Sequence, residues 1–333
     1  MRRRGLVLAV ALVAAALLPA TASAHVGRTA PAATNYLARI TSLPHGLEAR
    51  VIDGDGGIWL RVAPSLTVVV AGLRSEPYLR FSPAGVAVNI HSATWFLNRV
   101  RPLAVPNGIT STTPPRWKTL TSRHWWTWHE SRLHTLALAA HPAGNAFLGH
   151  WVLPLTVDGR RAEIRGGLWQ RAPASLLWFW PLLLAVALVP ALVTLREARL
   201  EAPVGAILAG LTLVAATTAR LGRELYGRPT VSTWQLVLVA STCLVAVALV
   251  ALYGKRDWRS IGAVAIGVVG AYQGLVLIST LRDGWVLSVV PPWLERSAAA
   301  VSLAAGASLL VAVLAAGVPA RSGEREREPL PQR

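Results

Sequence analysis

Histidine is the residue type with the most chemical reach in this chain, and its distribution is uneven. All eight histidines fall between positions 25 and 150 of the 333 residues, and none lies in the apolar second half. Histidine is costly in lipid, which accounts for part of this bias. The bias also gathers every imidazole that could ligate a metal into one part of the chain.

The segment "RHWWTWHESRLH" places His124, His129 and His134 within eleven residues. If Glu130 and Ser131 form a tight turn, His129 and His134 become diagonal neighbours in a hairpin, about 7–8 Å apart at the backbone. Two imidazoles at that separation can share a metal ion, with Glu130 as a further ligand or as an acceptor that fixes a tautomer. The alternative is a tryptophan-rich strand pair with surface histidines, because this spacing matches no diagnostic zinc motif.

His25 directly follows the small-residue triplet Ala22-Ser23-Ala24. If a protease cuts after Ala24, His25 offers its α-amine beside its imidazole. The amine has a pKa of about 8, so a metal ion can displace its proton near neutral pH. Nitrogen ligands in a tetragonal arrangement suit Cu(II). The alternative is that a histidine follows the cut by chance.

Sulfur ligands are almost absent, because Met1 and Cys243 are the only methionine and cysteine. Cu(I), which prefers such ligands, is therefore disfavoured. If a metal binds, we expect copper(II) or zinc, with His25, His129 and His134 as the ligands.

The elements that would position these histidines begin with an export signal. Residues 1–24 combine three arginines, a short apolar run and an A-x-A site, an order typical of a secretory signal peptide. The alternative is an uncleaved anchor helix. Cleavage would place the following domain outside the cytoplasm.

Residues 25–174 have strand-like hydrophobicity, and we expect an extracytoplasmic all-β sandwich of immunoglobulin-like or CopC-like type. Strand-like runs flank Asp53-Gly54-Asp55-Gly56-Gly57, which indicates a hairpin. Further expected strands are "LTVVVAG", "GVAVNI", "HWWTWH", "LHTLALAA" and "HWVLPLTV".

The rest of the chain is apolar, and we expect an all-α bundle of about five transmembrane helices within residues 175–318. The expected spans are 175–195, 203–219, 233–253, 260–281 and 297–318, of which the second is the shortest. Gly270 and Gly274 form a GxxxG pattern that favours helix packing over transport. Residues 319–333 are charged and are expected to form a disordered cytoplasmic tail.

Charge sets the expected orientation. Basic residues are more frequent in the segments expected to lie inside than in the short outer loops. The outer loops would hold Arg220, Arg223, Arg228, Arg282 and Arg296. The expected location is therefore the cell membrane, multi-pass, with the N-terminal domain outside and the C-terminus in the cytoplasm. The net charge of +17 comes from scattered arginines without a dense basic run, so we expect no nucleic-acid partner.

Two resemblances follow from these motifs. "ASAHV", followed by a small β-domain and membrane spans, resembles CopC-type copper-resistance proteins, some of which are fused to CopD-like membrane domains. That resemblance implies Cu(II) binding by the amine and imidazole of His25, and it places His134 near a late histidine ligand. The family's Asp-Gly before that histidine is missing, and the spans lack the His and Met expected of a copper path. "EPYLRFSPAGVAVNIHSATWFLNRVRP" resembles uncharacterised actinobacterial membrane proteins with the same layout and implies no activity.

The function expected from these features is extracytoplasmic, membrane-anchored binding of Cu(II) for copper tolerance or delivery. The main alternative is a non-metal envelope protein whose β-domain binds an envelope protein partner or anchors a complex. A histidine-brace oxidase is a third reading. The chain has neither a phosphate-binding glycine loop nor a nucleophile elbow, so the residues favour a binding protein in the lipid bilayer over an enzyme.

Overall fold

The structure is a computed structural model that describes residues 31–98, 103–139, 144–183, 201–226 and 259–317, together with residues 241 and 248. The signal peptide, His25 and the tail at 319–333 therefore lie outside the described residues. Within them the chain combines a β-rich domain with a group of helices, so the predicted mixed fold class is confirmed.

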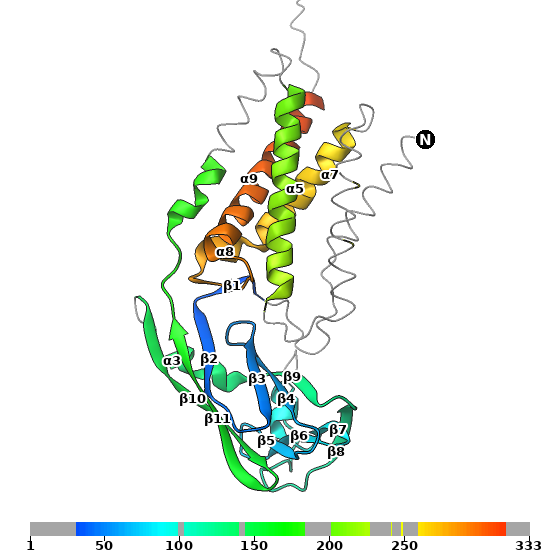
Figure 1. The fold of residues 1–333 in the computed structure, drawn as a ribbon, viewed down its shortest axis with the longest axis vertical. Coiled ribbons are helices and arrows are strands. Elements are labelled where there is room, and N and C mark those ends of the chain that lie inside the picture. The colour runs from blue at the N-terminus through cyan, green and yellow to red at the C-terminus, as the bar shows by residue number, and fades with distance from the viewer. Residues whose placement is uncertain are drawn as a thin grey trace, which may run out of the picture.

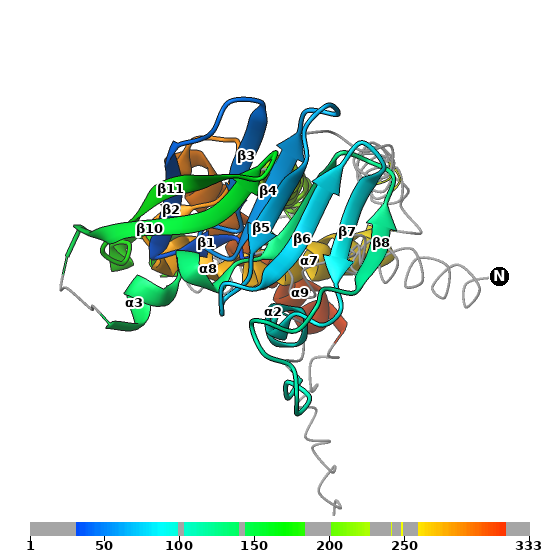
Figure 2. The same ribbon diagram turned by 90° about the horizontal axis from the view of Figure 1, so that it is seen from below.

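The β-domain consists of two antiparallel sheets (Figures 1 and 2). The larger sheet has seven strands in the order β2-β11-β10-β5-β6-β7-β8, which are Tyr36–Ser42, Arg160–Gln170, Ala146–Val157, Val68–Ala71, Pro77–Ser82, Gly85–Asn89 and Trp117–Thr121. The smaller sheet has the order β3-β4-β9, which are Leu47–Ile52, Gly57–Val62 and Trp125–His129. A short helix, α2 (Ala93–Leu97), follows β7.

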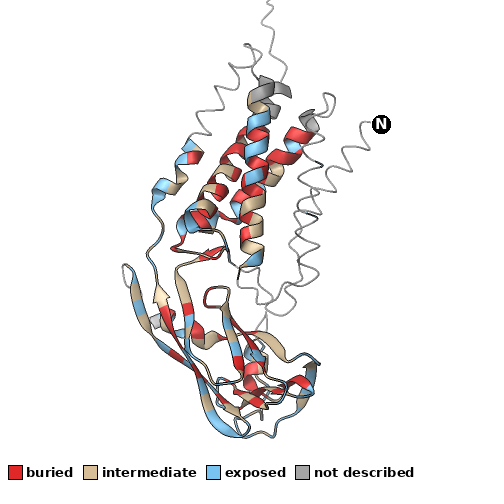
Figure 3. Ribbon diagram, viewed as in Figure 1, coloured by how far each residue is buried: buried red, intermediate tan, exposed pale blue. Residues whose placement is uncertain are grey.

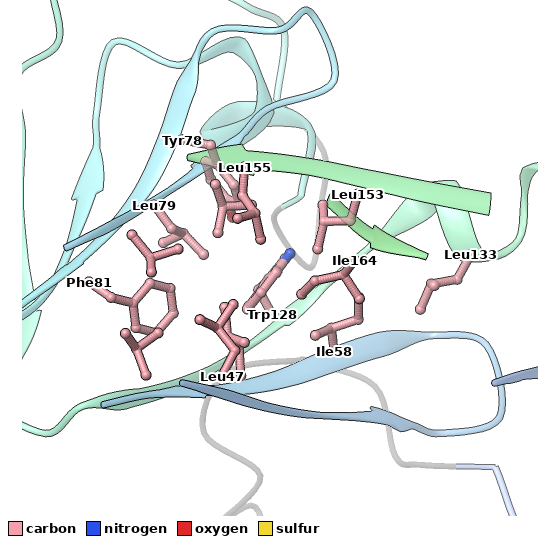
Figure 4. Packing of buried hydrophobic residues seen from close by; sticks show 14 of the residues in the cluster. Leu47, Ile58, Tyr78, Leu79, Phe81, Trp128, Leu133, Leu153, Leu155 and Ile164 are labelled. Atoms are coloured by element: carbon pink, nitrogen blue, oxygen red, sulfur yellow. The ribbon is translucent and has the colours of Figure 1, made fainter. Parts of the chain in front are cut away.

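The two sheets bury one common core between them (Figure 4). Side chains alternate between the two faces of strand β10, so one face points into the core. Trp151, Leu153 and Leu155 are buried on that face, whereas Val152 and Pro154 on the other face are exposed. Ile58 and Leu60 of the smaller sheet are fully buried against the same cluster. The residues that meet there are large and apolar, which is the main source of the domain's stability.

The predicted hairpin around the Asp53–Gly57 turn is confirmed. Strands β3 and β4 pair from Leu47↔Val62 to Ile52↔Gly57. The turn uses left-handed backbone at Asp53 and Gly54, with φ of 57° and 81°. Asp and Gly tolerate that conformation better than other residues, which is why the sequence turns there.

The hairpin predicted across Glu130 and Ser131 is wrong. Strand β9 ends at His129, and the chain continues as a 3₁₀ turn, η1 (Ser131–Leu133), and a short helix, α3 (Thr135–Ala139). The run "LHTLALAA" is therefore helical where it is described, although a strand was expected. In a short apolar run, neither the length nor the hydrophobic period distinguishes a strand from a buried helix.

The helical part contains α5 (Glu201–Leu225), α7 (Arg259–Val276), α8 (Ile278–Arg282) and α9 (Pro292–Gly317), preceded by the 3₁₀ turn η2 (Leu176–Phe179). Glycines let α7 and α9 approach closely. A Cβ at Gly270 would lie 3.2 Å from the Cα of Gly306, and one at Gly274 would lie 2.7 Å from the Cα of Leu303. The GxxxG pattern thus serves helix packing, as expected.

The prediction of five transmembrane helices is not supported. Within the described ranges, two helices are long and apolar enough to cross a membrane, Val204–Leu225 and Pro292–Val311. The expected span 260–281 is interrupted, because α7 ends at Val276 and α8 begins at Ile278. The expected span 233–253 lies outside the described residues except for two positions, and 175–195 is described only to Leu183.

Helix α5, predicted to be the shortest span, has 25 residues. Leu208 and Leu213 pack in a buried cluster with residues of α7 and α9, while Ile207 and Val214 are 62% and 68% exposed. Figure 3 shows that α5 carries both buried and exposed residues along its length. Exposed apolar side chains of this kind suit a lipid environment.

Four of the five arginines expected in outer loops lie within helices instead, and the fifth, Arg228, lies outside the described residues. Arg220 and Arg223 belong to the C-terminal part of α5, Arg282 is the last residue of α8, and Arg296 belongs to the first turns of α9. Helix α9 begins at Pro292, five residues earlier than predicted, because proline suits the first turn of a helix and Glu295 favours its N-terminus. The orientation inferred from charge therefore loses part of its basis.

The β-domain is joined to the helices by backbone pairing. Strand β1 (Ala33–Thr34) pairs with β12 (Trp285–Val286), which lies between α8 and α9 (Figure 1). The backbone N–H of Leu287 donates to the Ala32 carbonyl at 2.9 Å, and that of Ala174 donates to the Arg282 carbonyl at 2.7 Å. The start and the end of the β-domain are thus both hydrogen-bonded to the segment that runs from α8 to β12, which is called the helical base below.

Candidate metal-binding histidines

His129 ends strand β9 and is anchored to the hairpin turn of the other two strands in its sheet. Its Nδ1 lies 2.5 Å from the carbonyl oxygen of Gly56. A carbonyl oxygen can only accept, so Nδ1 carries the proton in this contact. The other ring nitrogen, Nε2, therefore holds the lone pair in the neutral imidazole.

His134 follows the 3₁₀ turn η1 and is anchored to the same hairpin turn. Its Nδ1 hydrogen-bonds to the carboxylate of Asp55, and its ring meets that of Tyr36 edge-on at 5.6 Å. Burial raises the pKa of Asp55, and the hydrogen bond and charge of His134 partly offset that rise. When Asp55 is ionised it accepts from Nδ1, and His134 presents Nε2 as His129 does.

A buried ion pair holds the segment between the two histidines in place. The Glu130 carboxylate is fully buried, accepts from the Arg132 Nε at 2.7 Å and accepts from the Trp128 indole at 3.0 Å. Arg132 also donates to the Ala71 carbonyl at 2.9 Å. These contacts fix the turn that separates His129 from His134.

The structure therefore brings the two predicted histidines to one turn, but not as diagonal hairpin neighbours. Glu130, proposed from the sequence as a ligand or as a tautomer-fixing acceptor, is engaged by Arg132 and Trp128 instead. The acceptor role falls to Asp55 and the Gly56 carbonyl. The sequence signal for this role is an acidic residue in the hairpin turn, where Asp is also a common turn residue.

His25 lies outside the described residues, which begin at residue 31. Ala32 is buried at the helical base, and nearby Thr34 lies against the turn, where a Cβ at Gly54 would be 2.6 Å from its Cγ2. Strand β1 thus lies beside the turn that holds His129 and His134.

Among the residues that the structure describes, no three His, Cys, Asp or Glu side chains are grouped so that they could hold a metal ion. A metal site with His129 or His134 would need a further ligand from elsewhere in the chain. Two other histidines have different surroundings: His91 contacts the Pro114 carbonyl at 3.1 Å, and His150 meets the Phe147 ring at 4.9 Å.

A separate feature lies on the outer face of the seven-stranded sheet. It is a groove of about 730 Å³ over strands β5, β6, β10 and β11, and its rim includes Arg161, Glu163 and Arg165. Arg165 pairs with Glu163 at 2.8 Å, so the rim carries both signs of charge.

No family model matches the sequence, and no curated protein and no solved structure matches it. The fold and the histidine cluster are therefore the basis for any functional conclusion.

Proposed function

We propose that this protein is a membrane-anchored, extracytoplasmic binder of Cu(II) that serves copper tolerance or delivery. His25, as the first residue of the exported chain, is the primary ligand, and His129 and His134 are the candidates that complete the site. The helical part holds the β-domain at the membrane.

One observation carries the proposal: both imidazoles have Nδ1 bound to an oxygen of the same turn, Gly56 for His129 and Asp55 for His134. Metal-binding histidines usually donate their second ring nitrogen to a carboxylate or a backbone carbonyl, which fixes the ring and leaves the other nitrogen for the metal. Two neighbouring histidines with that arrangement are better prepared for a metal than free surface histidines.

The donor set also fits the ion. The exported chain has no methionine and its one cysteine lies in an apolar segment, so nitrogen and oxygen donors dominate. The amine and imidazole of His25 with one or two further imidazoles match the preference of Cu(II). Thr34, in the first described strand of the exported chain, lies against this turn, since a Cβ at Gly54 would be 2.6 Å from its Cγ2.

The test uses the full chain, exported in a host that removes the signal peptide, with its first residue established by mass spectrometry. Titration with Cu(II), followed by electron paramagnetic resonance, is expected to show one tight site with nitrogen couplings. An added alanine before His25 should abolish that signal. His129→Ala and His134→Ala should each weaken binding or change the number of coupled nitrogens.

His45→Ala is the matched control, because His45 is exposed at the opposite end of strand β3 from the turn. Its spectrum should equal that of the wild type. A spectrum that is unchanged by the added alanine would remove the copper proposal, and so would a mature chain that starts elsewhere than His25.

The groove on the large sheet favours a second candidate, an envelope protein whose β-domain binds a protein partner. A photocrosslinking side chain at Thr156, inside the groove, should then give one discrete adduct in cells. The same side chain at Arg123, an exposed residue away from the groove, should give none. Absence of an adduct at Thr156 would count against this candidate.

A further inference from the structure

Two arginines border one tryptophan ring where the β-domain meets the helices. The Arg39 Cζ lies 5.2 Å and the Arg171 Cζ lies 5.0 Å from the centroid of the Trp285 ring. Arg39 belongs to β2, Arg171 follows β11 directly, and Trp285 belongs to β12. Cation–π contacts from both therefore place two positive charges against one ring.

Neither arginine has a carboxylate partner among the described residues. The ion pairs of this part of the chain involve Arg61, Arg132, His134, Arg165 and Arg282. Both Arg39 and Arg171 are exposed. Two exposed like charges beside one ring repel each other, and an anion that binds both would relieve that repulsion.

The position of the pair indicates which anion. Trp285 lies between α8 and α9, and the candidate membrane span of α9 begins at Pro292. Arg171 lies four residues before Ser175, where the chain turns into the apolar helical region. The pair thus lies where the β-domain ends and the apolar helices start, because Trp285 is paired with Thr34 of β1. Figure 1 shows β1 next to α8 at this junction.

Apolar rings extend the same surface. The Trp169 ring centroid is 5.2 Å from that of Phe147, and the Arg39 Cζ is 5.7 Å from the Trp169 ring. Phe147 is 48% exposed. Tryptophan and other amphipathic rings next to arginine are typical of the boundary between lipid headgroups and acyl chains.

We propose that Arg39 and Arg171, which both contact the Trp285 ring, bind the phosphate of an anionic phospholipid headgroup. This inference rests on the proposed placement of the helices in a bilayer, and it is independent of copper. The guanidinium groups supply charge and N–H donors to the phosphate, and the rings of Trp169 and Phe147 lie against the lipid. The contact holds the β-domain at a fixed height above the membrane.

The experiment is native mass spectrometry of the full chain in detergent, titrated with phosphatidylglycerol or with phosphatidylcholine. The wild type should retain phosphatidylglycerol in preference to phosphatidylcholine. The double variant Arg39→Gln, Arg171→Gln should lose about 30-fold in affinity for phosphatidylglycerol, since each basic residue near a membrane surface contributes roughly a fivefold factor. Arg39→Lys, Arg171→Lys keeps both charges and should retain most of the binding.

Arg160→Gln is the matched control, because Arg160 is exposed at the start of β11, at the other end of that strand from Arg171. It should bind lipid as the wild type does. Equal affinity of the Gln double variant and the wild type would overturn the proposal, and so would displacement of the lipid by inorganic phosphate at the same concentration. If the copper titration shows no site while phosphatidylglycerol still binds, the proposed function is contradicted and the lipid-binding inference is not.

Discussion

The Nδ1 of His134 is hydrogen-bonded to the carboxylate of Asp55, a residue 79 positions earlier in the chain. The contact joins the segment after β9 to the turn between β3 and β4. It makes Asp55 a positioning residue for His134, because the contact fixes the ring and leaves Nε2 for a metal.

Removal of that contact should weaken the metal site while the fold remains. Asp55→Ala is expected to lower Cu(II) affinity by about 10- to 100-fold, the range found when such supporting carboxylates are lost. Competition titration with a copper chelator measures the change. Glu163→Ala, an exposed carboxylate on the outer face of β11, should leave the affinity unchanged. If Asp55→Ala binds copper as tightly as the wild type, His134 is not a ligand.

The buried pair of Glu130 and Arg132 gives a prediction about stability. Arg132→Met leaves the fully buried Glu130 carboxylate without its cation, and such a loss typically costs about 3–5 kcal/mol. Thermal unfolding followed by circular dichroism should show a large drop in Tm. Arg61→Met removes an exposed pair with Glu48 at 3.7 Å, so its Tm should be nearly that of the wild type.

A second substitution checks the physical reason. Glu130→Gln combined with Arg132→Met removes both charges and should recover part of the lost stability. If the double variant is as unstable as Arg132→Met alone, the cost comes from lost packing and not from the uncompensated charge.

The sequence predicted the features of this protein that depend on neighbouring residues. Strands β3 and β4 followed from alternation on both sides of Asp53–Gly57, and the close packing of α7 followed from Gly270 and Gly274. Both signals are local, because period-two burial and small residues at helical spacing are visible within a few positions.

The errors came from contacts between distant segments. The turn after His129 is set by Glu130 and by Arg132, whose donor reaches Ala71, 61 residues away. No local pattern reveals that contact, so a hairpin was the natural expectation. The role of Asp55 was missed for the same reason. The contribution of His25 stays a prediction, because the residue lies outside the described part of the chain.

Glu76 gives a prediction about pH. Its carboxylate is buried and accepts hydrogen bonds from Ser92 Oγ at 2.6 Å, from Thr94 N at 2.9 Å and from Arg74 N at 2.9 Å. Burial alone would raise its pKa, but these hydrogen bonds outweigh burial and lower it below the ordinary value of 4.5.

A lowered folded-state pKa means that the ionised Glu76 stabilises the fold above the unfolded-state pKa, and that this stability is lost as pH falls through the folded-state pKa. Glu76→Gln should therefore cost about 1–3 kcal/mol at neutral pH. The difference in Tm from the wild type should shrink as the pH drops below about 4.5. Glu48→Gln, at an exposed position, should show no such pH-dependent difference; a constant difference for Glu76→Gln would contradict the assigned role.

Two helix glycines allow the effect of packing on stability to be distinguished from the effect of helix propensity. A Cβ at Gly270 of α7 would lie 2.1 Å from Thr212 Cγ2 and 2.9 Å from the Ser302 carbonyl oxygen, so Gly270→Ala must push the helices apart. Overpacking of this kind costs about 1–3 kcal/mol. Gly210 of α5 has no atom within 4 Å of the same position, so Gly210→Ala should be neutral or slightly stabilising. Thermal unfolding of the detergent-solubilised protein measures both, and equal Tm values for the two variants would show that the α7 contact does not limit stability.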